Sequence, residues 1–165
     1  MLYTILAAVL ILLDQLSKYL VRTHIPLGES VPFIPHVLDL TYVQNTGAAF
    51  SILREHTWIL TIVSAVIVVV VAVLVARKFI TGRLGLFCAT LIMAGGVGNL
   101  IDRIIFRYVT DMFQTTFMNF AVFNVADCCI TVGVVLLCVY LLFFYDKDHK
   151  KEDSAHGADL PSDDQ

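Results

Sequence analysis

Four long apolar stretches constrain this chain more than any other feature. Trp58–Ala76 carries no charged residue, and about 20 helical residues are enough to cross the roughly 30 Å core of a bilayer. Three further runs extend from Met1 to about Val21, from Leu84 to Ile101 and from Phe120 to Tyr145. The chain is 58% hydrophobic and 15% charged, whereas a soluble domain is about 45–50% apolar and about 25% charged. We therefore predict an all-α membrane protein with four transmembrane helices.

The segment of about 24–57 has a different character. Pro26, Gly28, Pro32 and Pro35 interrupt it, so no long helical period survives. Residues 38–43 alternate in polarity and are rich in strand-forming residues. We predict a small extracytoplasmic β-rich cradle that lies outside the hydrocarbon.

The expected organisation is one integral membrane domain over 1–145, followed by a disordered cytoplasmic tail over 146–165, which is polar and acidic. Four helices place both termini on one side of the membrane. The basic residues that mark this side as cytoplasmic are Arg77, Lys78, Arg83, Lys147, Lys150 and Lys151. Arginines also occur on the opposite side, so the charge bias is moderate. This topology puts 24–57 and the predicted 102–119 loop together on the external face.

Two aspartates stand out because ionisable groups near a membrane are costly and usually functional. Asp127 is predicted to lie about six residues into a helix that begins near Ala121, roughly 9 Å below its start. Asn124 precedes it by three residues and shares its face. Asp111 is placed in the short loop that feeds this helix, from which it can fold back over Asp127.

Two carboxylates held close together share one proton, because both cannot ionise easily. The ionised group can activate a water molecule while the protonated group polarises a peptide carbonyl. Asn124 or Asn45 could steady the oxyanion that develops. The structural alternative is that each aspartate caps a helix or is solvated; a cap is the less plausible role for Asp127, which lies inside the apolar register.

Other polar residues within the apolar runs allow structural and functional interpretations. Asn99, Asp102 and Arg103 form one polar corner, where Asp102 can brace the backbone and Arg103 can meet a lipid phosphate or a substrate carbonyl. Asp14 and Lys18, four residues apart, can neutralise each other with Lys18 snorkelling, or can contact substrate. The glycines before Asn99 can simply allow close helix packing.

Several classes of function find no support in the sequence. The four cysteines lie inside apolar runs with no C-x-x-C spacing, which favours free core thiols over a metal site, and no cofactor is expected. No basic patch suggests nucleic acid. The histidines fall in predicted loops or the tail, away from any serine or cysteine that could form a shared nucleophilic site.

Taken together, these segments resemble the bacterial lipoprotein signal peptidase family, also called signal peptidase II. The matching segments occur in the family's order: 14–18 (DQLSK), 45–50 (NTGAAF), 95–103 (GGVGNLIDR), 109–111 (VTD) and 123–127 (FNVAD). Two departures are small: Met112 stands where Phe is usual, and Cys128-Cys129 replaces small hydroxyl residues.

The resemblance implies an aspartyl endopeptidase that cuts diacylglyceryl-modified prolipoproteins before the lipidated cysteine, at the outer side of the bacterial plasma membrane. It makes Asp111 and Asp127 the catalytic dyad. It gives supporting or substrate-binding roles to Asn45, Gly47, Asn99, Arg103, Asn124, Asp14 and Lys18. It also implies contact with membrane phospholipid and inhibition by globomycin-type cyclic peptides. A monomer is expected.

Two functions from other classes compete with a peptidase. A proton- or ion-conducting protein would use the carboxylates as a relay, although their clustering toward one face of the membrane argues against it. An assembly scaffold would tolerate exchange of either aspartate for asparagine.

Overall fold

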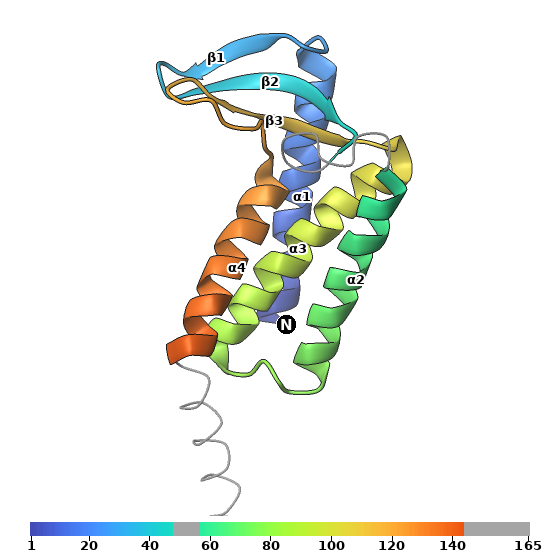
Figure 1. Cartoon of the computed structure of the whole chain (residues 1–165), viewed down its shortest axis with the longest axis vertical. Helices are drawn as coiled ribbons and strands as arrows, with labels where there is room; N and C mark the ends of the chain where they lie inside the picture. Colours follow the sequence, from blue (N-terminus) through green and yellow to red (C-terminus); the bar gives the residue numbers. More distant parts are fainter. Residues whose placement is uncertain (48–56, 144–165) are drawn as a thin grey trace, which may run out of the picture.

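A computed structural model describes residues 1–47 and 57–143 of the chain, and Figure 1 shows a helical bundle with a small sheet at one end. The helices in the described residues are α1 (Leu2–His24), α2 (Thr57–Ala76), α3 (Gly82–Phe106) and α4 (Val125–Phe143). All four are long and apolar enough to cross a membrane, which confirms the predicted number of spans. The tail over 146–165 and residues 48–50 of the 45–50 motif lie outside the described residues.

The predicted β-rich element is confirmed as a three-stranded antiparallel sheet, but it takes a strand from an unexpected segment. Its strands are β1 (Ser30–Ile34), β2 (Leu38–Asn45) and β3 (Val109–Thr115), in that spatial order. The segment predicted as a 102–119 loop therefore contains the end of a helix and a strand. Pairing with β2 satisfies the backbone of this segment, which would otherwise be left without partners beside the bundle.

Two helix boundaries also differ from the prediction. The third helix continues to Phe106 and stops where Arg107 adopts a left-handed conformation with φ 67°. The fourth helix begins at Val125 instead of near Ala121, because Phe123 still pairs with Phe113 of the sheet and Asn124 caps the helix. The later start of the fourth helix places Asp127 in its first turn, near the sheet residue that pairs with Phe123.

The third helix is the packing centre of the bundle, and glycines let the fourth helix approach it closely. A Cβ atom on Gly133 would lie 2.8 Å from Cγ1 of Ile92, and one on Gly95 would collide with the carbonyl oxygen of Ala126. Nearer the other end, Tyr140 is fully buried and its hydroxyl donates to the carbonyl oxygen of Thr81 at 2.8 Å. The predicted packing role of small residues is therefore present along the α3–α4 contact.

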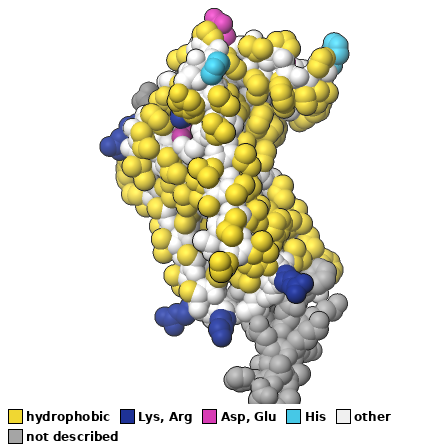
Figure 2. All heavy atoms as spheres, turned by 180° about the vertical axis from the view of Figure 1, so that it is seen from behind, with side chains coloured by type: hydrophobic (Ala, Val, Ile, Leu, Met, Phe, Trp, Pro, Cys, Tyr) yellow, Lys and Arg dark blue, Asp and Glu magenta, His cyan; other side chains and the backbone are white. Residues whose placement is uncertain are grey.

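The sheet has one apolar face and one polar face. Tyr42 and Met112 pack against Val21 and Ile25 at the end of α1. On the other face a hydrogen-bonded row crosses all three strands and consists of Ser30, Thr41 and Gln114. The sheet therefore sits over the bundle with its apolar face inward, and it brings Asp111 and Asn45 to the helix ends. Basic side chains gather at the opposite end of the bundle in Figure 2, where the sequence places Arg77, Lys78 and Arg83.

Candidate active site

Asp111 lies on β3, directly above the ends of α3 and α4. Its side chain is almost completely buried, and Oδ2 accepts a hydrogen bond from Asn45 Nδ2 at 2.8 Å. Asn124 Nδ2 donates to the other oxygen, Oδ1, at 2.7 Å. The strand itself is fixed to α3, because Asp102 Oδ2 accepts the backbone N–H of Thr110 at 2.9 Å. Asp111 is thus a strand residue held from two sides, and the prediction that it lies in a short loop was wrong.

Asp127 occupies the first turn of α4 and takes part in a reciprocal helix cap. Its backbone N–H donates to Asn124 Oδ1 at 2.9 Å, and its Oδ2 accepts the backbone N–H of Asn124 at 3.2 Å. The sequence argument made a cap the less plausible role for Asp127, whereas the structure shows it paired with the cap residue Asn124, because the helix starts four residues later than predicted.

The side-chain amides of Asn99 and Asn124 connect the two carboxylates. Asn99 Nδ2 donates to Asp127 Oδ1 at 2.8 Å, and Asn99 Oδ1 accepts from Asn124 Nδ2 at 3.2 Å. Since Asn124 also donates to Asp111, the two amides form a continuous bridge between the acids. Asn99 and Asn124 are both buried, so this bridge is protected from competing water.

The environment of Asp111 favours its protonated form. Burial disfavours the charge, and the nearby negative charge of Asp127 adds to this effect; together they raise the pKa of Asp111 to about 7, against the opposing N–H donors of Asn45 and Asn124. The carboxyl therefore exchanges its proton near neutral pH.

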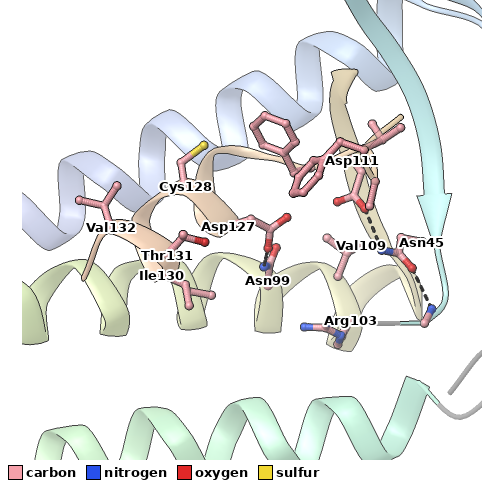
Figure 3. A pocket seen from close by; sticks show the side chains of 15 residues that line it. Asn45, Asn99, Arg103, Val109, Asp111, Asp127, Cys128, Ile130, Thr131 and Val132 are labelled. Atoms are coloured by element: carbon pink, nitrogen blue, oxygen red, sulfur yellow. Dashed lines mark hydrogen bonds between the residues drawn. The ribbon is translucent and has the colours of Figure 1, made fainter. Parts of the chain in front are cut away.

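Both carboxylates line a cavity of about 490 Å³ at the junction of the sheet and the bundle, shown in Figure 3. Its polar wall also contains Asn45, Gly47, Asn99 and Arg103. The apolar wall comes from the segment before α4 and from the exposed side of that helix, with Phe120, Ala121, Val122, Ile130, Thr131 and Val132 among its residues. The cavity thus joins a two-acid centre to a surface of the kind that faces lipid.

Arg103 points its charged group toward this cavity from α3. Nη1 donates to Ser64 Oγ of α2 at 3.3 Å, while the buried Nε has no hydrogen-bond partner. The contact with α2 was not foreseen from the sequence. Asp102, the other member of the predicted polar corner, is completely buried and braces the backbone of Thr110 as anticipated.

Asp14 and Lys18 do not line the cavity but lie beneath it. Lys18 Nζ contacts Asp14 Oδ2 at 2.9 Å and Asp102 Oδ2 at 3.4 Å, and the ammonium is completely buried. The mutual neutralisation expected from their spacing is present, whereas the expected snorkelling of Lys18 is not. Asp14 Oδ1 also accepts the backbone N–H of Ala126 at 2.9 Å, which ties α1 to the first turn of α4.

Two residues of this buried network were missed in the sequence. Gln15 Nε2 donates to the carbonyl oxygen of Gly98 at 3.0 Å, and Arg22 Nη1 donates to Thr110 Oγ1 at 2.9 Å. Arg22 follows Lys18 by four residues, so its position on the same helix face was a usable signal. Gln15 carries no comparable signal, because a single glutamine beside an aspartate has no distinctive spacing.

The cysteines are unpaired, and only two of them match the predicted core location. Cys88 and Cys129 are buried, whereas Cys128 and Cys138 are exposed on the outer side of α4. Cys128 also borders the cavity. Among the residues that the structure describes, no group of three or more His, Cys, Asp or Glu side chains is arranged to hold a metal ion.

Known proteins share both the sequence and the fold of this chain. Residues 6–143 match the family model described as signal peptidase (SPase) II. A lipoprotein signal peptidase of Streptococcus agalactiae serotype Ia is 46% identical over 138 residues, which cover 83% of this chain and 89% of the relative. One from Streptococcus pyogenes serotype M2 is 43% identical over 140 residues, covering 85% and 92% respectively.

Two solved structures, both described as bacterial membrane enzymes, have the same architecture. The first superposes with a TM-score of 0.81 at 30% identity and covers 85% of this chain and 87% of its own. The second has a TM-score of 0.74, also at 30% identity, with coverages of 86% and 93%. The chain therefore belongs to the lipoprotein signal peptidase (signal peptidase II) family, the bacterial membrane proteases that process prolipoproteins.

Proposed function

We propose that this protein is an aspartyl endopeptidase that removes signal peptides from diacylglyceryl-modified prolipoproteins by cutting before the lipidated cysteine. The observation that carries the proposal is the pair Asp111 and Asp127, which come from a strand and a helix and meet at the wall of one cavity. Family membership supplies the class of substrate. The geometry of the two acids supplies the chemistry.

In the proposed reaction Asp111 begins protonated and Asp127 begins ionised. Asp127 accepts two N–H donors and lies at the positive N-terminal end of α4, both of which accommodate a negative charge. It takes a proton from a water molecule as the oxygen adds to the peptide carbonyl carbon. Asp111 gives its proton to the carbonyl oxygen, which produces a neutral tetrahedral intermediate.

Collapse of this intermediate restores both acids. Asp127 passes the proton it received to the leaving nitrogen, and Asp111 recovers a proton from one hydroxyl as the C–N bond breaks. Each carboxyl thus ends in its starting state, and no covalent enzyme intermediate is needed.

The amide groups act on the acids more directly than on the substrate. The Nδ2 atoms of Asn45 and Asn124 are both turned toward Asp111, so the proton of Asp111 is the proposed donor to the developing oxyanion. Arg103 is the proposed contact for a substrate carbonyl, because its buried Nε lacks a partner beside the cavity. Gly47 lines the same wall, where the backbone can approach an extended peptide closely.

The apolar wall of the cavity suits a substrate that reaches the site from the membrane. Ile130 and Val132 belong to the surface of α4, which carries large exposed apolar side chains along its length. Acyl chains on the substrate can therefore remain in lipid while the peptide enters between α4 and the sheet. Membrane phospholipid and globomycin-type peptides are further expected ligands of this wall, and we expect the protein to act as a monomer.

The proposed orientation places the site on the extracytoplasmic side. Arg77, Lys78 and Arg83 lie at the end of the bundle away from the sheet, and positively charged loops remain cytoplasmic. Both termini then face the cytoplasm. A cysteine introduced into the β1–β2 turn and labelled in intact cells with a membrane-impermeant thiol reagent tests this assignment. Failure of the reagent to label that cysteine would contradict it.

The deciding experiment is cleavage of a lipid-modified precursor by the purified protein in detergent, with the same precursor lacking its lipid as the control. We expect a product that begins at the lipidated cysteine, identified by mass spectrometry, and little cleavage of the control. Equal cleavage of both precursors would refute the lipid requirement. Proton flux through reconstituted vesicles without any cleavage would favour the ion-conducting alternative.

A further inference from the structure

The hydrogen-bond network around the two acids includes a buried ammonium group that can only donate. Lys18 Nζ donates to Asn99 Oδ1 at 2.9 Å. Asn99 in turn presents Nδ2 to Asp127, and Asn124 presents Nδ2 to both Asn99 and Asp111. The oxygen of Asn99 thus accepts from Lys18 and Asn124, while the Nδ2 atoms of Asn99 and Asn124 each donate to one acid.

An asparagine side chain can present either its oxygen or its nitrogen, so something must choose between the two orientations. For Asn124 the choice is made by the backbone N–H of Asp127, which can only donate to Oδ1. For Asn99 the orientation is set chiefly by Lys18, because an ammonium group can only donate hydrogen bonds. Asn99 Oδ1 accepts from Lys18 at 2.9 Å and from Asn124 at 3.2 Å, so the contact with Lys18 is the shorter one. A reversed Asn99 would turn its oxygen toward Asp127 and its amide hydrogens toward Lys18.

Charged groups from two helices hold the ammonium group in place. Asp14 of α1 lies at 2.9 Å and Asp102 of α3 at 3.4 Å, and Arg22 approaches the other side of Asp102 at 3.6 Å. Lys18 and both aspartates are buried, so Nζ has three acceptors for its three hydrogens. Two of these contacts neutralise charge, and the third is the contact with Asn99.

We propose that Lys18 is a positioning residue that sets the amide orientation of Asn99 and thereby directs an N–H donor at Asp127. This role rests on the proposed aspartyl function and goes beyond the charge balance within the bundle. Lys18 touches neither carboxylate of the dyad and does not line the cavity. Besides the charge that it places near Asp111, Lys18 is connected to Asp127 through the single amide of Asn99.

A simple Lys18→Met change would leave Asp14 and Asp102 without their buried partner, so loss of folding would obscure its effect. The informative protein is Asp14→Asn/Lys18→Met, which removes one positive and one negative charge together. Its partner is Asp14→Asn/Lys18→Gln, which has the same charge but retains an N–H donor near Asn99. Asp14→Asn alone, with the ammonium kept, is the reference for both.

Steady-state cleavage of the lipid-modified precursor and thermal unfolding are measured for all three proteins. We expect the Met double variant to unfold near the temperature of the Asp14→Asn reference but to lose about tenfold or more in kcat, with little change in KM. We expect the Gln double variant to recover most of that loss. A Met double variant that matches the reference in kcat, or a Gln double variant that is no faster than the Met double variant, would overturn the proposal.

Two further comparisons keep the result decisive. If the Met double variant does not accumulate in the membrane, the Gln double variant is compared with the Asp14→Asn reference: a kcat within about tenfold supports the donor role, and a complete loss of turnover overturns it. Failure of the aspartyl mechanism itself would appear elsewhere, as cleavage by Asp111→Asn or Asp127→Asn. Those two variants do not depend on Lys18, so the two failures are distinguishable.

Discussion

The two ends of the α3–α4 contact are held together by different forces. From its middle to the end away from the sheet, the contact consists mainly of apolar groups in close approach, with Gly133 against Ile92 and the ring of Tyr140 over Gly85, and the Tyr140 hydroxyl adds one hydrogen bond. At the sheet end, Asn99 and Asp127 join the same two helices through a hydrogen bond. The first end can contribute stability without taking part in chemistry, whereas the second places its polar groups where the proposed reaction occurs. Substitutions at the two ends should therefore affect different measurements.

The largest difference between the effect on activity and the effect on stability is expected for substitutions of Asp111 and Asp127. Asp111→Asn and Asp127→Asn should each lower kcat by about 10⁴-fold, the upper end of what general acid–base catalysis contributes. Both variants should remain folded and inserted, because asparagine retains an acceptor for the neighbouring N–H groups. Precursor cleavage and thermal unfolding are measured on the same preparations. Undiminished cleavage by either variant would remove that residue from the proposed dyad.

Asn124→Ala should have the next largest effect on kcat, and it should also lower stability. It removes a donor to Asp111 and should lower kcat by about 10²-fold with a smaller change in KM. It also removes the cap of α4, which should cost about 1 kcal/mol of stability. An unchanged kcat in the folded variant would show that this amide does not support the chemistry.

Two glycines provide a matched test of the two ends. A Cβ atom on Gly98 would lie 2.6 Å from Asp14 Oδ2 and 3.3 Å from Cβ of Ala126, so Gly98→Ala should displace groups under the dyad and lower kcat about tenfold. The atoms nearest a Cβ on Gly133 belong to Ile92, Leu91 and Cys88, away from the dyad, so Gly133→Ala should cost about 1–3 kcal/mol of stability with little change in kcat. Equal kinetic defects in the two variants would mean that the ends are not functionally distinct.

Asn45→Ala tests the role of the sheet end through the pH dependence of kcat. The hydrogen bond from Asn45 favours ionised Asp111, so its removal should raise the pKa of Asp111 further above about 7. Because the protonated form is active in the proposed mechanism, turnover falls as pH rises through this pKa. The alkaline limb of the kcat profile should thus move upward by about one pH unit. Movement in the opposite direction would contradict protonated Asp111 as the acid.

Tyr140→Phe should have the smallest effect and should lower only the stability of the fold. It removes the hydroxyl that donates to the Thr81 carbonyl oxygen, at a cost of about 1 kcal/mol. The unfolding temperature should fall by a few degrees while kcat and KM stay unchanged. A kinetic defect would indicate that the packed end of the bundle communicates with the cavity.

The sequence predicted the four helices well because their apolar runs are long and interrupted by few charges. It predicted the boundaries less well where local and tertiary preferences compete. The residues just before Val125 are apolar enough to extend a helix, but Phe123 finds a better partner in β3 and Asn124 then starts the helix. That four-residue difference is the reason why the capping role of Asp127 was not anticipated.

The residues of the candidate site could be predicted from the sequence, whereas many of the hydrogen bonds between them could not. Spacing indicated Asp14 with Lys18 and Asn124 with Asp127, since these are neighbours on one helix or at its first turn. Contacts between segments far apart in sequence have no such signal. The bond from Lys18 to Asn99 and the one that the backbone N–H of Thr110 donates to Asp102 exist only because two helices and a strand converge.

The reciprocal cap between Asn124 and Asp127 has a consequence for biogenesis. The proposed base takes its place only when the first turn of the last membrane helix has formed, because the same bonds make that turn and hold the carboxylate. A newly synthesised chain with three helices inserted therefore lacks the assembled form of the proposed catalytic pair. We therefore expect peptidase activity to arise only when the last helix has joined the bundle.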